Sequence, residues 1–191
     1  MSKIKIKVYP YLIPKPVVLI GALVDDKPNF FTVADVSTTG YQIPRFVVSS
    51  GKGHYTNNGI IENECFSVNI PSIDMVQQTD YCGTKSGRRA DKAEVFEIFY
   101  GGELEKAPMI KEAPISHACK LVKNVDFGDS HYLFIGEIKE TYVNEDYLAE
   151  KGNLLDINKV RPFTFYYDNL YYKVGESFAQ AYKIGKEYQK K

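Results

Sequence analysis

The sequence predicts a mainly β protein that folds as an antiparallel barrel with short peripheral helices. Runs of β-branched and aromatic residues recur along the chain, and helical segments between them are few and brief. The regular strand–helix alternation of a parallel α/β fold is missing. The 191 residues, 44% of them hydrophobic, suffice for one core. We expect a barrel domain over residues 1–175 and a helical tail over residues 176–191.

Strand patterns extend over most of the chain. The Lys–Ile alternation of residues 1–10 is typical of a strand with one polar face. Two hairpins are indicated by the turn residues DDKPN and GDS between apolar runs. The further expected strands are Val17–Asp25, Phe30–Val36, Arg45–Ser50, Phe66–Ile70, His117–Phe127, His131–Val143 and Leu170–Val174.

Helix patterns are shorter. Residues 55–63 predict a helix despite Gly59, and a second begins after Ser72, which has the side chain of an N-cap. Residues 91–99 and 145–151 are two further short candidates. In the tail, apolar residues between 178 and 188 recur near the helical period.

Charge and cysteine content exclude several classes of protein. The 24 basic residues balance 24 acidic ones, so the net charge favours neither nucleic acid nor an anionic membrane. No apolar run is long enough to span a bilayer, and the start lacks the apolar block of a signal peptide. Three widely spaced cysteines exclude a disulfide scaffold and an all-cysteine zinc site. These features predict a cytoplasmic protein.

The segment SSGKGHYT, residues 49–56, joins a strand to a probable helix. Its Gly51-x-Gly53 begins like a dinucleotide fingerprint, but Thr56 stands at the third glycine position and no regular βαβ unit surrounds it. Small residues before a helix still let backbone N–H groups approach a phosphate. The segment is therefore either an anion site or a flexible connecting loop.

The segment YCGTKSGRRADK, residues 81–92, contains many hydrogen-bond donors and hardly any core residue. Gly83 and Gly87 permit close approach of a ligand, and the donors are Thr84, Ser86, Arg88, Arg89 and Lys92. Asp91 has the side chain of a cap for the next helix. A solvated basic loop is the alternative, and Cys82 is either a redox thiol or a small packing residue. If this segment and SSGKGHYT converge, they could bind one anion together.

Motifs for other chemistry are missing. The sequence has no G-x-S-x-G, H-E-x-x-H or P-loop, and its three histidines are too scattered to form a recognisable metal motif. Hydrolase, protease and ATPase activities therefore have no support, and we expect no metal.

Together, several ordered segments resemble the flavin reductase-like proteins with an FMN-binding split barrel, in particular their flavoredoxin-type branch. The segment YCGTKSGRRADK is the most specific of them. The others are PKPVVLIGALVDDKPNFFTVAD, SSGKGHYTNNGIIENECFSVNIPS, FGDSHYLFIGEI and RPFTFYYDNLYYKVG.

This resemblance implies a Greek-key-like antiparallel split β-barrel that forms a homodimer and holds one FMN per subunit near the interface. It assigns Thr32, Val33, Ala34 and Asp35 to the isoalloxazine and ribityl region, and Cys82 and Gly83 to the flavin's side. It assigns Ser49, Ser50, Gly51, Lys52, Tyr55 and Thr56 to the phosphate end, with Ser86 and Lys92 nearby. His131 and Phe163 complete the expected set.

Three functions are consistent with this resemblance. The first is NAD(P)H-dependent flavin reduction, in which hydride passes to flavin N5 and no side-chain acid or base is needed. The second is an electron carrier with tightly bound FMN and a protein redox partner. The third is a split barrel that has lost its flavin and acts in binding or assembly.

Overall fold

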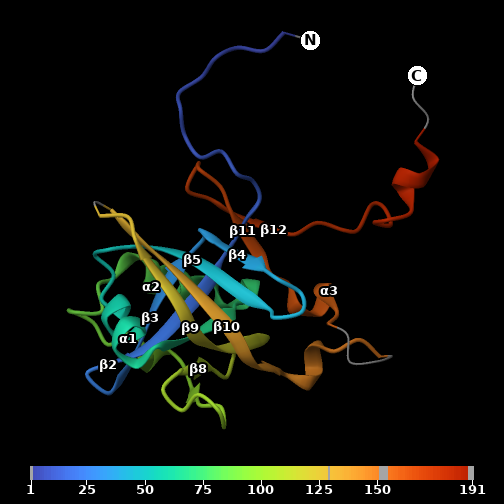
Figure 1. The fold of residues 1–191 in the computed structure, drawn as a ribbon. Helices are drawn as coiled ribbons and strands as arrows, with labels where there is room; N and C mark the ends of the chain where they lie inside the picture. Colours follow the sequence, from blue (N-terminus) through green and yellow to red (C-terminus); the bar gives the residue numbers. More distant parts are fainter. Residues whose placement is uncertain (1, 129, 151–154, 189–191) are drawn as a thin grey trace.

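The computed structural model describes residues 2–128, 130–150 and 155–188. Its main feature is a seven-stranded antiparallel sheet with the strand order β3-β2-β6-β9-β10-β5-β4 (Figure 1). The expected mainly β, antiparallel fold is confirmed. The strands of this sheet are β2 (Val18–Val24), β3 (Lys27–Val33), β4 (Val36–Thr39), β5 (Arg45–Gly51), β6 (Cys65–Ile70), β9 (Ile115–Asp126) and β10 (His131–Val143).

Smaller elements surround the sheet. A three-stranded sheet has the order β1-β11-β12, and β7 pairs with β8. Their bounds are β1 (Lys15–Pro16), β7 (Ile98–Phe99), β8 (Met109–Ile110), β11 (Phe163–Phe165) and β12 (Tyr171–Lys173). The helices are α1 (Thr56–Asn63), α2 (Val76–Thr84) and α3 (Ile157–Val160), with 3₁₀ turns η1 (Ile73–Met75), η2 (Ala93–Val95), η3 (Glu145–Tyr147) and η4 (Ile184–Glu187).

The sheet is buried on both faces where β2 and β3 pair. Ile20 and Phe31 point into one core with Phe66 and Phe134. Their neighbours in sequence point to the other face, where Phe30 joins a second core with residues of α2. Because adjacent side chains of a strand alternate between faces, burial of both requires an almost continuous apolar run. This requirement explains why residues 17–24 are apolar throughout.

Two helices place the donor-rich segments. Helix α1 lies against β2 at Gly59, where a Cβ would come within 1.9 Å of the Leu23 carbonyl oxygen, so only glycine permits this contact. Helix α2 follows η1, whose N-cap is Ser72 as expected; its hydroxyl accepts a hydrogen bond from the Asp74 amide. The last turn of α2 includes Tyr81–Thr84.

That last turn argues against the alternative that the whole of residues 81–92 is a solvated basic loop. Cys82 is 1% exposed and belongs to the second core, and Lys92 is only 4% exposed. The sequence suggested a loop because polar residues dominate the segment. However, Cys82 packs in the second core and so fixes the start of the segment.

The expected N-terminal strand is wrong. Residues 2–13 form no strand, and Ile4 and Val8 are 84% and 92% exposed. Instead the chain from Tyr9 to Leu12 contacts Tyr167, with the Tyr9 and Tyr167 ring centroids 4.8 Å apart. A strand pattern forms a strand only where a neighbouring edge accepts its hydrogen bonds.

Three expected helices are also shorter in the structure. Residues 91–99 form only η2, followed by strand β7, because Phe96 and Ile98 pack against the second core. The segment 145–151 forms η3 over its first residues, and residue 151 lies outside the described residues. In the tail η4 is the only helical turn among the described residues, and Phe178 and Tyr182 are fully exposed.

Within the described part of the chain, none of the helices has both the length and the apolar character that a membrane span requires.

Candidate functional site

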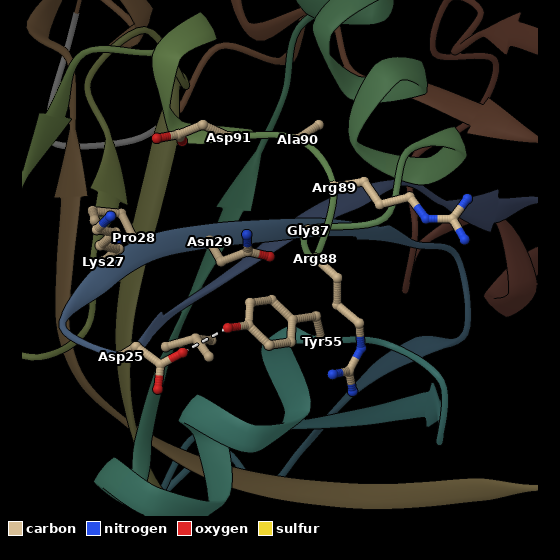
Figure 2. A pocket seen from close by; sticks show the side chains of 11 residues that line it. Asp25, Lys27, Pro28, Asn29, Tyr55, Gly87, Arg88, Arg89, Ala90 and Asp91 are labelled. Carbon is tan, nitrogen blue, oxygen red and sulfur yellow. Dashed lines mark hydrogen bonds between the residues drawn. The ribbon is translucent and has the colours of Figure 1, made fainter.

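The two donor-rich segments, remote in sequence, meet in the structure. The Arg88 guanidinium lies 5.0 Å from the centroid of the Tyr55 ring, so the segments touch directly (Figure 2). Asn29 of β3 also lies between them: the Thr56 hydroxyl donates to its Oδ1 at 2.9 Å. Gly87 abuts the same side chain, and a Cβ there would lie 2.4 Å from Oδ1. This contact explains the need for glycine at position 87.

A hydrogen-bond network fixes the histidine at the start of α1. Asn57 Nδ2 donates to the Gly51 carbonyl, which orients the amide so that its Oδ1 accepts from the Ser50 hydroxyl at 2.6 Å. The Ser50 oxygen therefore accepts from His54 Nδ1, 3.0 Å away. Neutral His54 is left with a lone pair on Nε2, while its ring stacks on Phe31 at 4.5 Å.

Three basic side chains gather beside this network. Burial lowers the pKa of His54, and the nearby charges of Lys92 and His131 lower it further. Burial also lowers the pKa of Lys92. His131 pairs with Gly51 across β5 and β10, and a Cβ at Gly51 would lie 3.8 Å from the His54 ring and 4.0 Å from that of His131. We call His54, Lys92 and His131 the basic cluster.

The basic cluster fits an anion. Lys92 is 4% exposed, and its ammonium donates to the Cys82 carbonyl oxygen at 2.8 Å. Among the described residues, no carboxylate forms an ion pair with Lys92 or with either histidine. A buried cation without a counter-charge is costly. A phosphate, which carries close to two negative charges, would offset that cost.

The expected flavin-side residues lie at the end of β3. The Thr32 hydroxyl donates to the Thr79 carbonyl of α2 at 2.5 Å. Gly83 lies beside Thr32, and a Cβ on Gly83 would lie 3.4 Å from Thr32 Cβ. The side chain of Val33 points to the opposite face of β3 and packs in the first core. Val33 could therefore contact a ligand beside Thr32 only through its backbone. Ala34 is half-buried next to it. The structure therefore brings Thr32 and Gly83 together, as expected.

Asp35 and Lys52 are both engaged in ion pairs. Asp35 lies 2.5 Å from the buried ammonium of Lys15, and its carbonyl accepts from the Ser49 amide. Lys52 reaches the β9–β10 turn, where it lies 2.6 Å from the Asp126 carboxylate and donates to the Gly128 carbonyl. The side chain of Lys52 is thus directed to the hairpin turn.

Cys82 has the environment of a packing residue. Burial raises the pKa of its thiol to about 11, despite the nearby Lys92 charge. The thiol is therefore protonated at neutral pH and is a poor nucleophile. All three cysteines are free and buried.

Two further predicted residues lie apart from the basic cluster. Ser86 is exposed, and its carbonyl accepts from the amides of Arg89 and Ala90 in a tight turn. Phe163 is buried in β11, with its ring 5.3 Å from that of Tyr171. Within the described residues, no hydrogen bond or ring contact joins Phe163 to either donor-rich segment.

Sequence reasoning missed His54, Asn57 and Asn29. His54 stands inside the segment 49–56 and Asn57 directly follows it, so their position in and beside that segment is the signal that could have found them. Asn29 gave no such signal, because it follows a proline in an ordinary hairpin. No group of three or more potential metal ligands occurs among the described residues.

The chain is similar to proteins of known structure. A flavoredoxin from Methanosarcina acetivorans is 42% identical, with a TM-score of 0.92, and the match covers 97% of this chain and 98% of that one. A flavoredoxin from Desulfovibrio vulgaris (Miyazaki F) is 32% identical, with a TM-score of 0.88 and coverage of 96% and 100%.

A more distant structure shares the fold. A protein from Shewanella frigidimarina with a split barrel domain is 18% identical, with a TM-score of 0.77 and coverage of 88% and 86%. The architecture is thus the expected antiparallel split barrel. The family model of the flavin reductase like domain matches residues 11–173. The chain therefore belongs to the flavin reductase-like family and is similar to its flavoredoxins.

Proposed function

We propose that this protein is an FMN-binding oxidoreductase that catalyses NAD(P)H-dependent flavin reduction. The observation that carries the proposal is the basic cluster, because a buried Lys92 with no carboxylate partner among the described residues, beside two histidines, favours an anion. Membership of the flavin reductase-like family makes flavin the expected ligand, and FMN is the flavin whose phosphate matches the cluster.

The residues present fit FMN in specific ways. Lys92 and His131 would bind the phosphate, and backbone N–H groups at the start of α1 would contribute donors. Thr32 and Gly83 would line the ring, with Gly83 leaving space for a planar group. When bound, FMN would supply the redox chemistry by accepting hydride at N5. The chain itself would orient the flavin, exclude water and hold His54 neutral.

An electron carrier is the second candidate, and the similarity to two flavoredoxins favours it. In that function a protein or small donor would reduce the bound FMN. Anaerobic stopped-flow mixing with NAD(P)H separates the two candidates. We expect rapid bleaching of the flavin band; a band that persists until a protein donor is added would support the carrier.

Flavin binding itself is tested on the freshly purified full chain. We expect the absorption spectrum of an oxidised flavin, and release by heat of a chromophore that is identified as FMN. A colourless protein that gains no colour on mixing with FMN would contradict the proposal and support a flavin-free binding role.

We also propose that the protein is a homodimer and works in the cytoplasm. Exposed apolar residues in both terminal segments, among them Ile4, Val8, Phe178 and Tyr182, support a further subunit contact. Three free cysteines support a reducing compartment.

A further inference from the structure

A buried cation lies next to the loop that carries the expected ring-side residues. Lys15 of β1 pairs with Phe165 of β11, and its side chain is only 9% exposed. Its ammonium lies 2.5 Å from the Asp35 carboxylate and 5.0 Å from the centroid of the Tyr167 ring. No other carboxylate of the described residues forms an ion pair with Lys15. The carboxylate and the ring thus fix the position of this charge.

Lys15 keeps its charge despite its burial. Burial by itself would lower the pKa of the ammonium, but the hydrogen bond to Asp35 and the charge of Asp35 together raise the pKa above its usual value. The pair is asymmetric, because the side chain of Asp35 is 58% exposed whereas that of Lys15 is enclosed by protein. Removal of the ammonium would therefore leave the Asp35 carboxylate as an uncompensated negative charge.

Asp35 lies where the expected flavin-binding residues meet. Its carbonyl accepts from the Ser49 amide at 2.9 Å, which joins the β3–β4 loop to the start of the first donor-rich segment. Three residues earlier, Thr32 contacts Gly83 and bonds to α2. The ion pair of Lys15 and Asp35 is therefore adjacent to the strand end to which the resemblance assigns the isoalloxazine region.

We propose that Lys15 is a positioning residue for the flavin's redox chemistry: it offsets the charge of Asp35 and so makes bound FMN easier to reduce. This inference rests on FMN binding, which the reductase and the carrier functions share. Hydride transfer to N5 adds two electrons and one proton, so the ring gains one negative charge. A nearby carboxylate without a counter-charge would oppose that gain, and a paired carboxylate opposes it far less.

The test measures the reduction of FMN bound to the full chain at equilibrium, without turnover. Anaerobic titration with a reference dye gives the ratio of reduced to oxidised flavin at a known potential. Lys15→Met keeps most of the buried stem and removes the ammonium. We expect the ratio at a fixed potential to fall about tenfold, which for a two-electron couple is a shift of about 30 mV to lower values.

Further variants separate the effect of charge from that of packing. Lys15→Met combined with Asp35→Asn removes both charges and should return the ratio close to that of the parent chain, which a loss of packing would not do. Asp35→Asn alone changes an exposed side chain and should raise the ratio, so it decides the matter if Lys15→Met fails to fold. Lys111→Met breaks an exposed ion pair of 2.5 Å elsewhere and should leave the ratio unchanged.

Several outcomes would overturn the inference. They are an unchanged ratio in Lys15→Met or in Asp35→Asn, a fall in Lys15→Met that the second substitution does not restore, and an equal fall in Lys111→Met. A parent chain that binds no FMN would instead contradict the proposed function. Because FMN binding is measured before reduction, the two failures are distinguishable.

Discussion

At the scale of residues, the account depends on a few polar groups whose burial makes them informative. Lys92 is largely withdrawn from water, yet its ammonium donates to the Cys82 carbonyl and pairs with no carboxylate of the described residues. Arg88, by contrast, is exposed, and a solvated surface would tolerate it without a ligand. Burial therefore distinguishes Lys92, whose charge favours a bound anion, from an exposed cation such as Arg88. Burial cannot be read from the sequence alone.

The first prediction concerns the charge of Lys92. Lys92→Met retains most of the buried stem but removes the ammonium, so we expect FMN affinity to fall by roughly 1–3 kcal/mol, which is about five- to 150-fold. Riboflavin affinity should change little, because riboflavin carries no phosphate. Fluorescence titration with both flavins measures this. Lys111→Met removes an exposed cation elsewhere and serves as the control; equal losses in both variants would exclude Lys92 as a phosphate ligand.

The second prediction concerns pH. Burial lowers the pKa of His117 from 6.5 to about 4, and its ring packs on Phe46 and bonds to Thr141. A pKa lower in the folded state means that the unfolded chain binds the proton more tightly. The stability that neutral His117 allows is therefore complete above pH 6.5 and is lost progressively as the pH falls toward 4.

Urea denaturation across this range measures the effect. We expect the midpoint of the parent protein to fall between pH 6.5 and pH 4, and the fall to be smaller in His117→Gln. An identical pH dependence in both proteins would show that another group is responsible.

At the scale of elements, the sequence predicts where strands can form but not which strands pair with one another. The bounds of β10 match the prediction, because a β-branched and aromatic run there is limited by the local GDS turn and by Asn144. The N-terminal run had an equally clear pattern but forms no strand. The difference lies in the partner: β10 pairs on both edges, with β9 and β5. Such pairing is a long-range property that local pattern does not contain.

The same limit applies to the candidate site. Both donor-rich segments were recognised from composition, since glycine, hydroxyl and cationic residues cluster within a few positions. Their contact through Asn29 could not be predicted, because it depends on β3 lying between α1 and the loop after α2. Lys52 illustrates the same limit, since composition cannot show that its ammonium pairs with Asp126.

The third prediction follows from the docking of α1. Gly59→Ala would place a Cβ 1.9 Å from the Leu23 carbonyl oxygen, so the helix must move away from β2. We expect a loss of roughly 1–3 kcal/mol in the free energy of unfolding. FMN affinity should fall as well, because α1 positions His54 and Thr56. Gly102→Ala, where no atom lies within 4 Å, is the control; unchanged stability in Gly59→Ala would contradict this docking.

At the scale of the whole molecule, the chain is a compact barrel with two exposed terminal segments. In Figure 1 both termini extend from the barrel on the same side, near β11 and β12. Apolar side chains such as Ile4, Val8, Phe178 and Tyr188 are largely exposed there. Exposure of this kind is unfavourable for an isolated subunit and favours association.

The fourth prediction is therefore the oligomeric state. Sedimentation equilibrium of the full chain should give twice the subunit mass of 21.7 kDa. Removal of residues 2–8 should weaken the dimer, because it removes three exposed apolar side chains of the N-terminal segment. A monomer at micromolar concentration, or a truncated chain with unchanged dimer affinity, would refute the role of this segment.

A crystal structure of the full chain with FMN tests the central claim most directly. The account predicts that the FMN phosphate lies in the basic cluster, within hydrogen-bonding distance of Lys92 and of the start of α1. A phosphate bound away from both donor-rich segments, with Lys92 still bonded only to the Cys82 carbonyl, would contradict it.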